Sequence, residues 1–234
     1  MLIKEIEGLK FPVEYIIRFF FREGLHKRTG KVLELGSGNG NNIMLFYQYG
    51  WDVTGVDNAS ILIEQANRNF LKVQNESGLT NSFHHFCDDM ANFVTSYSGP
   101  EVDVLLLPHS IYYLPHDKIV TLVRQCKTKG IIKDGTILFL TVRTPEDYRF
   151  GKGRRLSEKS FELTIDETGE KGCTITFFTE QEILYLLGKF FKLNSKIVLS
   201  QVYENYQNGQ VVKNSDITIW GKIGITGQKG EKCE

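Results

Sequence analysis

Runs rich in valine, isoleucine and leucine alternate with helically spaced segments along most of the chain, and this alternation restricts the possible folds more than any other feature. It is typical of an open, largely parallel sheet with helices on both faces. The run VDVLLL is almost continuously apolar, which indicates a strand buried on both sides. The expected strands are 31–35, 51–57, 83–87, 102–107 and 136–142. The expected helices are 41–49, 60–70 and 117–127.

The pattern changes after the fifth expected strand. Two β-rich runs, 161–165 and 173–178, flank a turn-rich stretch and predict an inserted hairpin. Thr179 followed three residues later by Glu182 predicts a capping box at the start of a helix over 180–188.

A second hairpin is predicted at the end of the chain. Its two runs, 196–206 and 211–221, flank the pair Asn208-Gly209. Asn-Gly suits a tight hairpin turn because both residues tolerate positive φ. The sheet is therefore expected to end in an antiparallel pair of strands.

The most informative stretch is ELGSGNG, which lies between the first expected strand and the first expected helix. Gly36, Gly38 and Gly40 permit a sharp turn and a close approach of backbone to a ligand. The dinucleotide fingerprint GxGxxG would require a glycine at Asn41, so the spacing disfavours a nicotinamide cofactor. Glu34 suits a ligand with an ammonium group better than a pyrophosphate.

Acidic residues follow two further strands, at the sheet edge where open α/β sheets bind ligands. Asp57 ends the second strand, 21 residues after Gly36, and its carboxylate can accept hydrogen bonds from both hydroxyls of a ribose. Asp88, Asp89 and Met90 end the third strand. A carboxylate there can accept a hydrogen bond from the exocyclic amine of adenine.

These motifs resemble those of the class I S-adenosylmethionine (SAM)-dependent methyltransferases. The resemblance extends from Pro12 to Gly221 and rests on VLELGSGNG, VTGVDNAS, HFCDDMANF and VDVLLLPHSIYYLP, followed by the late hairpin. It implies an α/β, Rossmann-like three-layer sandwich with a seven-stranded, mostly parallel sheet. The implied strand order is 3-2-1-4-5-7-6, with strand 7 antiparallel and a hairpin inserted after strand 5. The implied cofactor is SAM, with S-adenosylhomocysteine as the product.

The resemblance also implies roles for single residues. Glu34 would orient the ammonium group of SAM, Asp57 would bind the ribose, and Asp89 with Met90 would bracket the adenine. FPVEYIIRF looks like an N-terminal helix that folds over the cofactor, with Pro12 in its first turn and with Tyr15 and Arg18 near the SAM carboxylate. The expected cofactor contacts are Tyr15, Arg18, Glu34, Gly36, Ser37, Gly38, Asn41, Asp57, Asn58, Asp88, Asp89, Met90, Pro108, His109 and Tyr113.

Other interpretations of these residues stay open. Glu34 can cap backbone amides of the glycine loop instead of meeting a ligand. Asp88 competes with Asp89 for the adenine contact, and it can also be a solvated or helix-capping acid. Tyr15 can pack in the core.

Methyl transfer from a sulfonium is an in-line displacement, so a base is needed only when the acceptor must lose a proton. His109, at the end of the fourth strand, is the candidate base, because the reference pKa of imidazole suits proton transfer near neutrality. It can instead bind the cofactor or line the pocket. Tyr113 can pack on the methionyl chain or act as a cation–π partner. His84 and His85 point to opposite faces of a strand, and no metal site is expected.

The acceptor is less constrained by the sequence. RTPEDYRFGKGRR, after the fifth strand, contains five basic residues beside few acids. Arg143 and Arg149 are the candidate substrate residues, which suggests a small, anionic or sugar-like acceptor methylated on oxygen or nitrogen. A solvated, mobile basic loop is the alternative for this segment. RNA or protein methylation and a non-catalytic SAM-binding scaffold are the alternative functions.

Composition restricts the partners. Lysine plus arginine equals aspartate plus glutamate, 28 of each, whereas nucleic-acid binders usually carry a basic excess. Four scattered cysteines without a CxxC pair indicate reduced thiols and a cytoplasmic protein, and no run of about 20 apolar residues predicts a membrane span. The oligomeric state, monomer or homodimer, is left open.

We expect a single methyltransferase domain over 1–234. Its expected parts are an N-terminal helical cap (1–30), a cofactor-binding core (31–142), a substrate-side insertion (143–180), the end of the sheet (181–224) and a tail (225–234).

Overall fold

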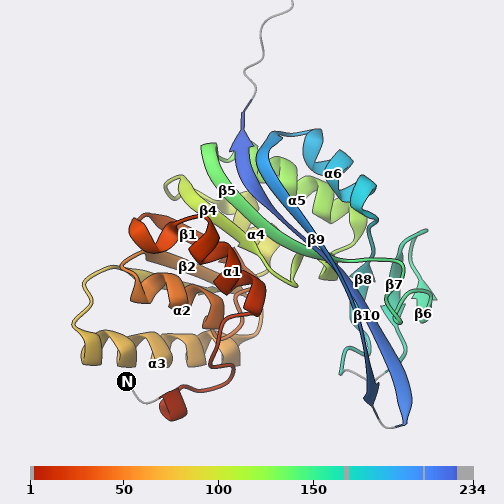
Figure 1. Ribbon diagram of the computed structural model, residues 1–234, viewed down its shortest axis with the longest axis horizontal. Coiled ribbons are helices and arrows are strands. Elements are labelled where there is room, and N and C mark those ends of the chain that lie inside the picture. Colours follow the sequence, from red (N-terminus) through yellow and green to blue (C-terminus); the bar gives the residue numbers. More distant parts are fainter. Residues whose placement is uncertain (1–2, 166–168, 208, 226–234) are drawn as a thin grey trace, which may run out of the picture.

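The computed structural model describes residues 3–165, 169–207 and 209–225. Its central feature is a seven-stranded sheet with the order β3-β2-β1-β4-β5-β10-β9 (Figure 1). The first five strands are parallel, while β10 is antiparallel to both of its neighbours. The sheet consists of β1 (Lys31–Leu35), β2 (Asp52–Asp57), β3 (Phe83–Cys87), β4 (Val102–Leu107), β5 (Ile132–Arg143), β9 (Lys192–Gln207) and β10 (Gln210–Gly224). The predicted strand order and the antiparallel strand are confirmed.

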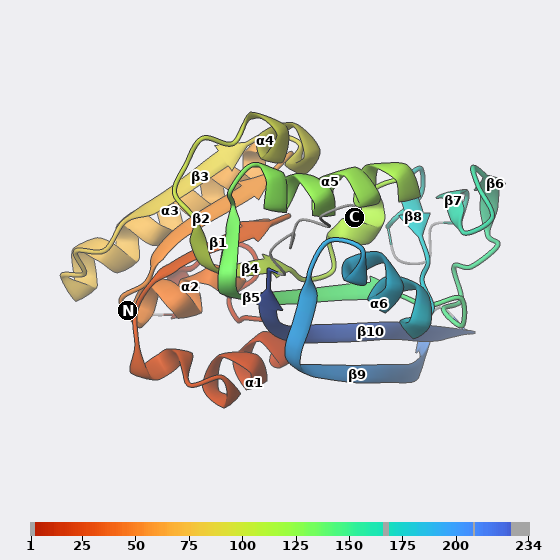
Figure 2. The same cartoon turned by 90° about the horizontal axis from the view of Figure 1, so that it is seen from above.

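Helices cover both faces of this sheet, as the buried side chains on each face show. The helices are α1 (Glu14–Arg22), α2 (Asn41–Gln48), α3 (Ser60–Ser77), α4 (Met90–Ser96), α5 (His116–Thr128) and α6 (Glu180–Gly188). One core joins α1, α2 and α3 to the sheet through residues such as Phe19, Phe46 and Phe139. The other joins α4, α5 and α6 through residues such as Leu105, Leu122 and Leu187. Figure 2 shows α1 and α5 on opposite sides of the sheet.

Several boundaries differ from the sequence prediction. Helix α3 continues to Ser77, seven residues beyond the expected end, because no glycine occurs before Gly78, which adopts the left-handed conformation of a C-cap. Strand β5 begins at Ile132 rather than at the expected residue 136, and the register with β4 shifts there as in a β-bulge. Helix α1 begins at Glu14 with Val13 as its N-cap, so Pro12 precedes the helix instead of lying in its first turn.

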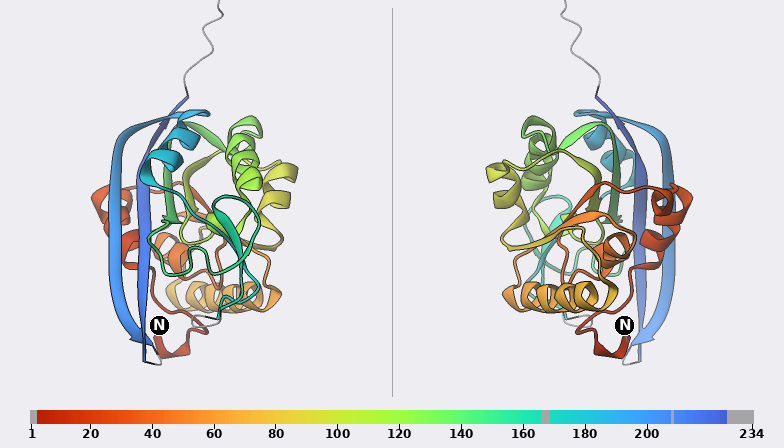
Figure 3. Two further views of the ribbon diagram at one scale, coloured as in Figure 1. Left: turned by 90° about the vertical axis from the view of Figure 1, so that its right-hand side faces the viewer. Right: turned by 90° about the vertical axis from the view of Figure 1, so that its left-hand side faces the viewer.

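The inserted segment after β5 forms a small sheet of its own. Strands β7 (Ser160–Leu163) and β8 (Thr174–Thr176) pair antiparallel as the hairpin prediction requires, although residues 166–168 lie outside the described part. A third strand, β6 (Gly153–Arg155), was not predicted from the sequence. The sheet packs on a separate small core that contains Tyr112, Phe161 and Phe177. Figure 3, left, looks onto this segment.

The end of the chain follows the sequence prediction closely. Thr179 and Glu182 form the capping box that begins α6. Strands β9 and β10 form a long hairpin that continues past the last β5 pairing, Asp216 with Arg143, and extends beside the small sheet (Figure 1). Asn208, one half of the predicted turn, lies outside the described residues, and its partner Gly209 has the positive φ of +79° that such a turn uses.

Candidate active site

A pocket of about 490 Å³ lies beyond the carboxyl ends of β1 to β4, at the edge that the sequence analysis predicted. Eight of the expected cofactor residues line it, and they are Gly36, Asp57, Asn58, Asp88, Asp89, Met90, His109 and Tyr113. The expected residues outside this lining are Tyr15, Arg18, Glu34, Ser37, Gly38, Asn41 and Pro108. The roles of both groups toward a cofactor stay predictions.

The glycine loop is shaped by backbone conformation as well as by packing. Gly36, Gly38 and Gly40 all have positive φ, which side chains rarely adopt. A Cβ at Gly36 would lie 2.3 Å from the Ser110 Cβ, so this glycine is required by the contact between the loops after β1 and β4. A Cβ at Gly38 would meet nothing within 4 Å, which leaves open space beside that residue.

Asp57 ties the glycine loop to the second strand. Its carboxylate accepts hydrogen bonds from the backbone N–H of Gly38 and of Ala59, both at 2.9 Å, and it lines the pocket. An ionised carboxylate has further lone pairs after these two bonds. Asp57 can therefore order the loop and accept hydrogen bonds from a ligand at the same time.

The neighbouring acids, Asp88 and Asp89, have different surroundings. Asp89 is the N-cap of α4, because its Oδ1 accepts hydrogen bonds from the backbone of Ala91 and Asn92. The capping role that the sequence analysis considered for Asp88 thus belongs to Asp89. The Asp88 carboxylate has no hydrogen-bond partner among the described residues, and both acids line the pocket with Met90.

Glu34 is fully buried in β1. Asn42 donates a hydrogen bond of 2.7 Å to its Oε1, while its Oε2 has no partner among the described residues. Burial raises the pKa of this carboxyl to about 8, against the lowering effect of the Asn42 bond. A buried oxygen without a partner is costly, and it fits the expectation of a ligand with a positively charged group nearby.

Three asparagines hold the segment before α1 against the glycine loop and α3. Asn39 donates to the carbonyls of Glu7 and Leu9, and Asn69 bonds the backbone of Glu7. Asn41, an expected cofactor contact, instead donates to the carbonyl of Phe11. These amides satisfy backbone groups that no strand or helix pairs, which explains how an irregular segment stays in place.

The structure places the remaining N-terminal candidates on helix α1, outside the pocket. Tyr15 packs at the edge of the core beneath α1, and the guanidinium of Arg18 lies over its ring at 5.5 Å. This arrangement agrees with the packing alternative for Tyr15.

His109 lines the pocket in an unusual backbone conformation, with a φ of +50°. Burial, together with the nearby Arg143, lowers the pKa of its imidazole to about 4. This corrects the expectation of a base that titrates near neutrality. Pro108 is buried beside it and does not face the pocket, whereas Ser110 lines the pocket and bonds the Leu35 carbonyl at 2.6 Å.

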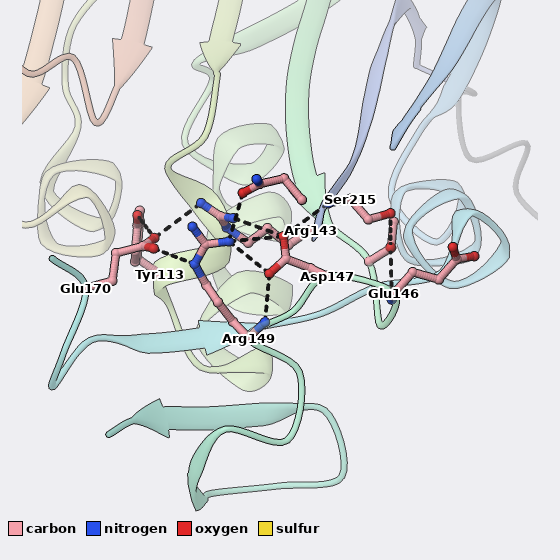
Figure 4. A network of polar contacts seen from close by, with 9 residues as sticks. Tyr113, Arg143, Glu146, Asp147, Arg149, Glu170 and Ser215 are labelled. Atoms are coloured by element: carbon pink, nitrogen blue, oxygen red, sulfur yellow. Dashed lines mark hydrogen bonds and ion pairs between the residues drawn. The ribbon is translucent and has the colours of Figure 1, made fainter. Parts of the chain in front are cut away.

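The first two arginines of the basic segment after β5 are buried and paired, whereas Lys152, Arg154 and Arg155 are exposed. Arg143 and Arg149 are only 8% and 3% exposed, so this part of the segment is not a solvated loop. Both guanidiniums are ion-paired with Asp147 and with Glu170 (Figure 4). The positive charges that favoured an anionic substrate are therefore already compensated by acids of the chain itself.

Tyr113 joins this network to the pocket. Its hydroxyl donates to Glu170 Oε1 at 2.7 Å, while its ring lines the pocket (Figure 4). Burial raises the pKa of Tyr113, and the carboxylate acts in the same direction, so the hydroxyl stays protonated. The neighbouring Tyr112 is buried, with the Arg143 guanidinium over its ring at 4.9 Å.

Sequence reasoning missed part of the pocket wall, namely Val56, Ala59, Leu62, Ser110, Leu114, Cys173 and Thr174. Cys173 and Thr174 come from the insertion, which was expected on the substrate side without any of its residues after Arg149 being assigned to the pocket. His85, on strand β3, packs on Phe70 and Phe83 and bonds Asn67.

Within the described residues, no cluster of histidine, cysteine or acidic side chains has the arrangement of a metal site. No described helix combines the length and apolar character that a membrane crossing requires. The described cysteines, Cys87, Cys126 and Cys173, are free thiols.

Comparison with known families identifies this arrangement. The model of a methyltransferase domain matches residues 9–189, which is more than half of the chain. The chain belongs to the methyltransferase domain family. This methyltransferase is an enzyme whose cofactor is SAM. A search of curated proteins found no match.

Solved structures share the fold of this methyltransferase at low sequence identity. A SAM-dependent methyltransferase from Methanosarcina mazei is 21% identical, with a TM-score of 0.61 and coverage of 91% of this chain and 99% of that one. TehB from Haemophilus influenzae is 14% identical, with a TM-score of 0.61; the match covers 94% of this chain and spans only 64% of TehB. The 1,6-didemethyltoxoflavin-N1-methyltransferase from Burkholderia thailandensis is 15% identical, with a TM-score of 0.55 and coverage of 88% and 76%.

Proposed function

We propose that this enzyme methylates an oxygen or nitrogen of a small acceptor that is uncharged where it meets the protein. The observation that carries this proposal is the composition of the pocket wall formed by the segment after β4 and by the insertion. There the described lining consists of His109, Ser110, Tyr113, Leu114, Cys173 and Thr174, and the imidazole is neutral at pH 7. A neutral sugar hydroxyl or a ring nitrogen fits this wall better than a phosphate or carboxylate does.

The residues around the pocket fit SAM as a ligand. Bound SAM supplies an activated methyl group on a sulfonium that can leave as a neutral thioether. On the protein side, Asp57 and Asp88 are carboxylates able to accept from ribose and adenine, and the Glu34 Oε2 is a buried acceptor without a partner. The protein's contribution is alignment and exclusion of water, with His109 proposed to accept a proton from the acceptor.

The size of the pocket bears on the alternatives. A volume of about 490 Å³ has to hold the cofactor as well, which favours a small acceptor over RNA or protein. The Burkholderia neighbour, whose structure holds 1,6-didemethyltoxoflavin beside S-adenosylhomocysteine, gives an example of a small acceptor on this fold. The single-domain organisation over 1–234 and the cytoplasmic location remain part of the proposal.

One experiment tests the function directly. The purified chain is incubated with SAM labelled in the methyl group and with a cell extract, and the extract is then separated by mass. Label in the low-mass fraction supports a small acceptor, whereas label in RNA or protein contradicts it. Binding of SAM without any transfer of label would instead indicate a scaffold.

Asp57→Ala is expected to weaken S-adenosylhomocysteine binding by about 1–3 kcal/mol, because a ribose hydroxyl loses a charged acceptor and the Gly38 N–H loses its partner. Titration calorimetry measures the change. Asp52→Ala is the matched control, since Asp52 begins the same strand and accepts hydrogen bonds from Ser82. Unchanged affinity in a folded Asp57→Ala variant would disprove the ribose assignment.

SAM binding at pH 7 is expected to release about one proton from Glu34. With a pKa of about 8 the free carboxyl is mostly protonated at this pH, and a nearby ammonium group favours its ionised form. The apparent binding enthalpy should therefore differ between phosphate and Tris buffers, and this difference should vanish at pH 9 and in Glu34→Gln. Equal enthalpies for the wild type in both buffers at pH 7 would contradict this coupling.

A further inference from the structure

Glu170 is the point where three separate parts of the chain meet. Its carboxylate accepts hydrogen bonds from the Tyr113 hydroxyl at 2.7 Å, from Arg143 Nη2 at 3.2 Å and from Arg149 Nε at 2.5 Å (Figure 4). Tyr113 follows β4, Arg143 ends β5, and Arg149 lies in the first part of the insertion. The Glu170 side chain is only 12% exposed, so its bonds to the two buried arginines are largely shielded from water, whereas Tyr113 is partly exposed at the pocket.

The residues that Glu170 fixes also form the wall of the pocket. The Cys173 N–H donates to the Glu170 carbonyl, and the Leu163 N–H donates to the Cys173 carbonyl. Glu170 and Cys173 therefore belong to one tight turn that is anchored to β7. Cys173, Thr174 and Tyr113 all line the pocket. The Glu170 side chain is thus the polar link that holds this turn against the ends of β4 and β5.

The same carboxylate balances buried charge. Arg143, Arg149 and Asp147 are each at most 8% exposed. Three carboxylates, those of Asp147, Glu170 and Asp216, lie near the two guanidiniums, and Glu170 is the one that binds both arginines and Tyr113. The adjacent Asp216 is a third carboxylate beside the arginines; burial raises the pKa of its carboxyl to about 6, so it is still mostly ionised at pH 7. Removal of Glu170 would therefore take one negative charge from a buried cluster that lies next to a pocket wall.

We propose that Glu170 is a positioning residue of this methyltransferase. It holds Tyr113 and the Cys173–Thr174 turn in place as one wall of the pocket, and its negative charge favours the positive sulfonium of SAM beside the neighbouring arginine pair. The second effect rests on the proposed function, while the first concerns only the protein itself.

Cys173 provides a direct probe of the wall. The ligand-free full chain is treated with iodoacetamide, and mass spectrometry follows the alkylation of each cysteine separately. In Glu170→Gln the rate at Cys173 is expected to rise about tenfold, because local opening of the turn needs fewer broken contacts. Glu162→Gln is the matched control: Glu162 lies in the same small sheet and pairs with the exposed Arg154. Its Cys173 rate should stay within about twofold of the wild type, as expected for a surface ion pair.

Cys126 distinguishes local opening of the turn from a general loss of stability. This residue of α5 is 2% exposed and lies in the hydrophobic core. An equal rise at Cys126 and Cys173, or no rise at Cys173, would overturn the proposal. If Glu170→Gln does not fold, Tyr113→Phe takes its place, since it removes one hydrogen bond without leaving a buried charge unpaired. About a threefold rise at Cys173 alone is then expected, and an unchanged rate would refute the link through Tyr113.

Ligand affinities test the charge effect. SAM carries the positive sulfonium and S-adenosylhomocysteine does not, so a purely structural defect weakens both equally. In Glu170→Gln we expect SAM to lose about threefold to tenfold more affinity than S-adenosylhomocysteine, and Glu162→Gln to weaken neither. Equal losses would overturn the electrostatic part. A wild-type chain that binds neither compound would contradict the proposed function, and the alkylation rates would still decide whether Glu170 holds the wall.

Discussion

The variant Gly38→Val is expected to abolish detectable SAM binding, a loss of at least about 1,000-fold, in a chain that remains folded. The Gly38 N–H donates to the Asp57 carboxylate, so this backbone lies next to the residue proposed to bind the ribose. A Cβ there would project into space that no protein atom occupies within 4 Å, which is space that a ligand held close to the backbone requires. Calorimetry with SAM and with S-adenosylhomocysteine measures the effect.

The difficulty with this variant is its backbone strain, because a side chain in the left-handed region costs about 1–2 kcal/mol wherever it occurs. Gly78→Val is the appropriate control. Gly78 caps α3 with a φ of +64°, close to the +54° of Gly38, and its Cβ would also meet nothing within 4 Å. The two variants should lose similar stability in thermal unfolding, yet only Gly38→Val should lose the ligand. Retained affinity in Gly38→Val would place the cofactor elsewhere.

His109→Ala is expected to lower the rate of methyl transfer by about 10²–10⁴-fold while changing SAM affinity little. This expectation applies if His109 accepts the acceptor's proton, as proposed. Its position in the pocket lining supports that role. His84→Ala, on the exposed edge strand β3, serves as the control. A small rate effect would indicate that the acceptor loses no proton before transfer, whereas a large loss of SAM affinity would make His109 a cofactor contact.

The lowered pKa of His109 determines how the rate of methyl transfer is expected to depend on pH. The imidazole is neutral above about pH 4, so the wild-type rate should be flat from pH 6 to 8 as far as this group is concerned. A rise of the rate with pH that is centred near pH 6.5 would contradict the lowered pKa of His109. Stability gives an independent check: between pH 4 and 6.5 the unfolded chain binds a proton that folded His109 does not, so the free energy of unfolding rises with pH. His85 contributes in the same sense, and His109→Ala should reduce the slope rather than remove it.

The cofactor edge was predictable because each part of it follows a strand end, and strand ends were visible in the sequence. Gly36 and Asp57 were found from their spacing alone, and both line the pocket. Asn41 was expected at the same edge, but its spacing does not show that its amide bonds the Phe11 carbonyl, 30 residues earlier. Long-range side-chain to backbone bonds leave no periodic pattern in a sequence.

The acceptor side was less predictable for a related reason. Arg143 and Arg149 were read as available charges, since a count of nearby acids in sequence missed Glu170, which lies 27 and 21 residues further along. The contribution of Cys173 and Thr174 to the pocket depends on how the insertion folds back. That path is determined by packing of Phe161 and Phe177 on Tyr112, which only tertiary structure reveals.

The two ends of the insertion lie side by side. Arg143, where it departs, bridges to Phe177, where it returns, and the Phe178 N–H bonds the Arg143 carbonyl. A segment that leaves and rejoins a sheet at one point can change in length or sequence without moving the strands around it, since closing a longer loop costs little entropy. We therefore expect residues 144–176 to differ between related enzymes with different acceptors, while the strands that carry the proposed cofactor site stay the same.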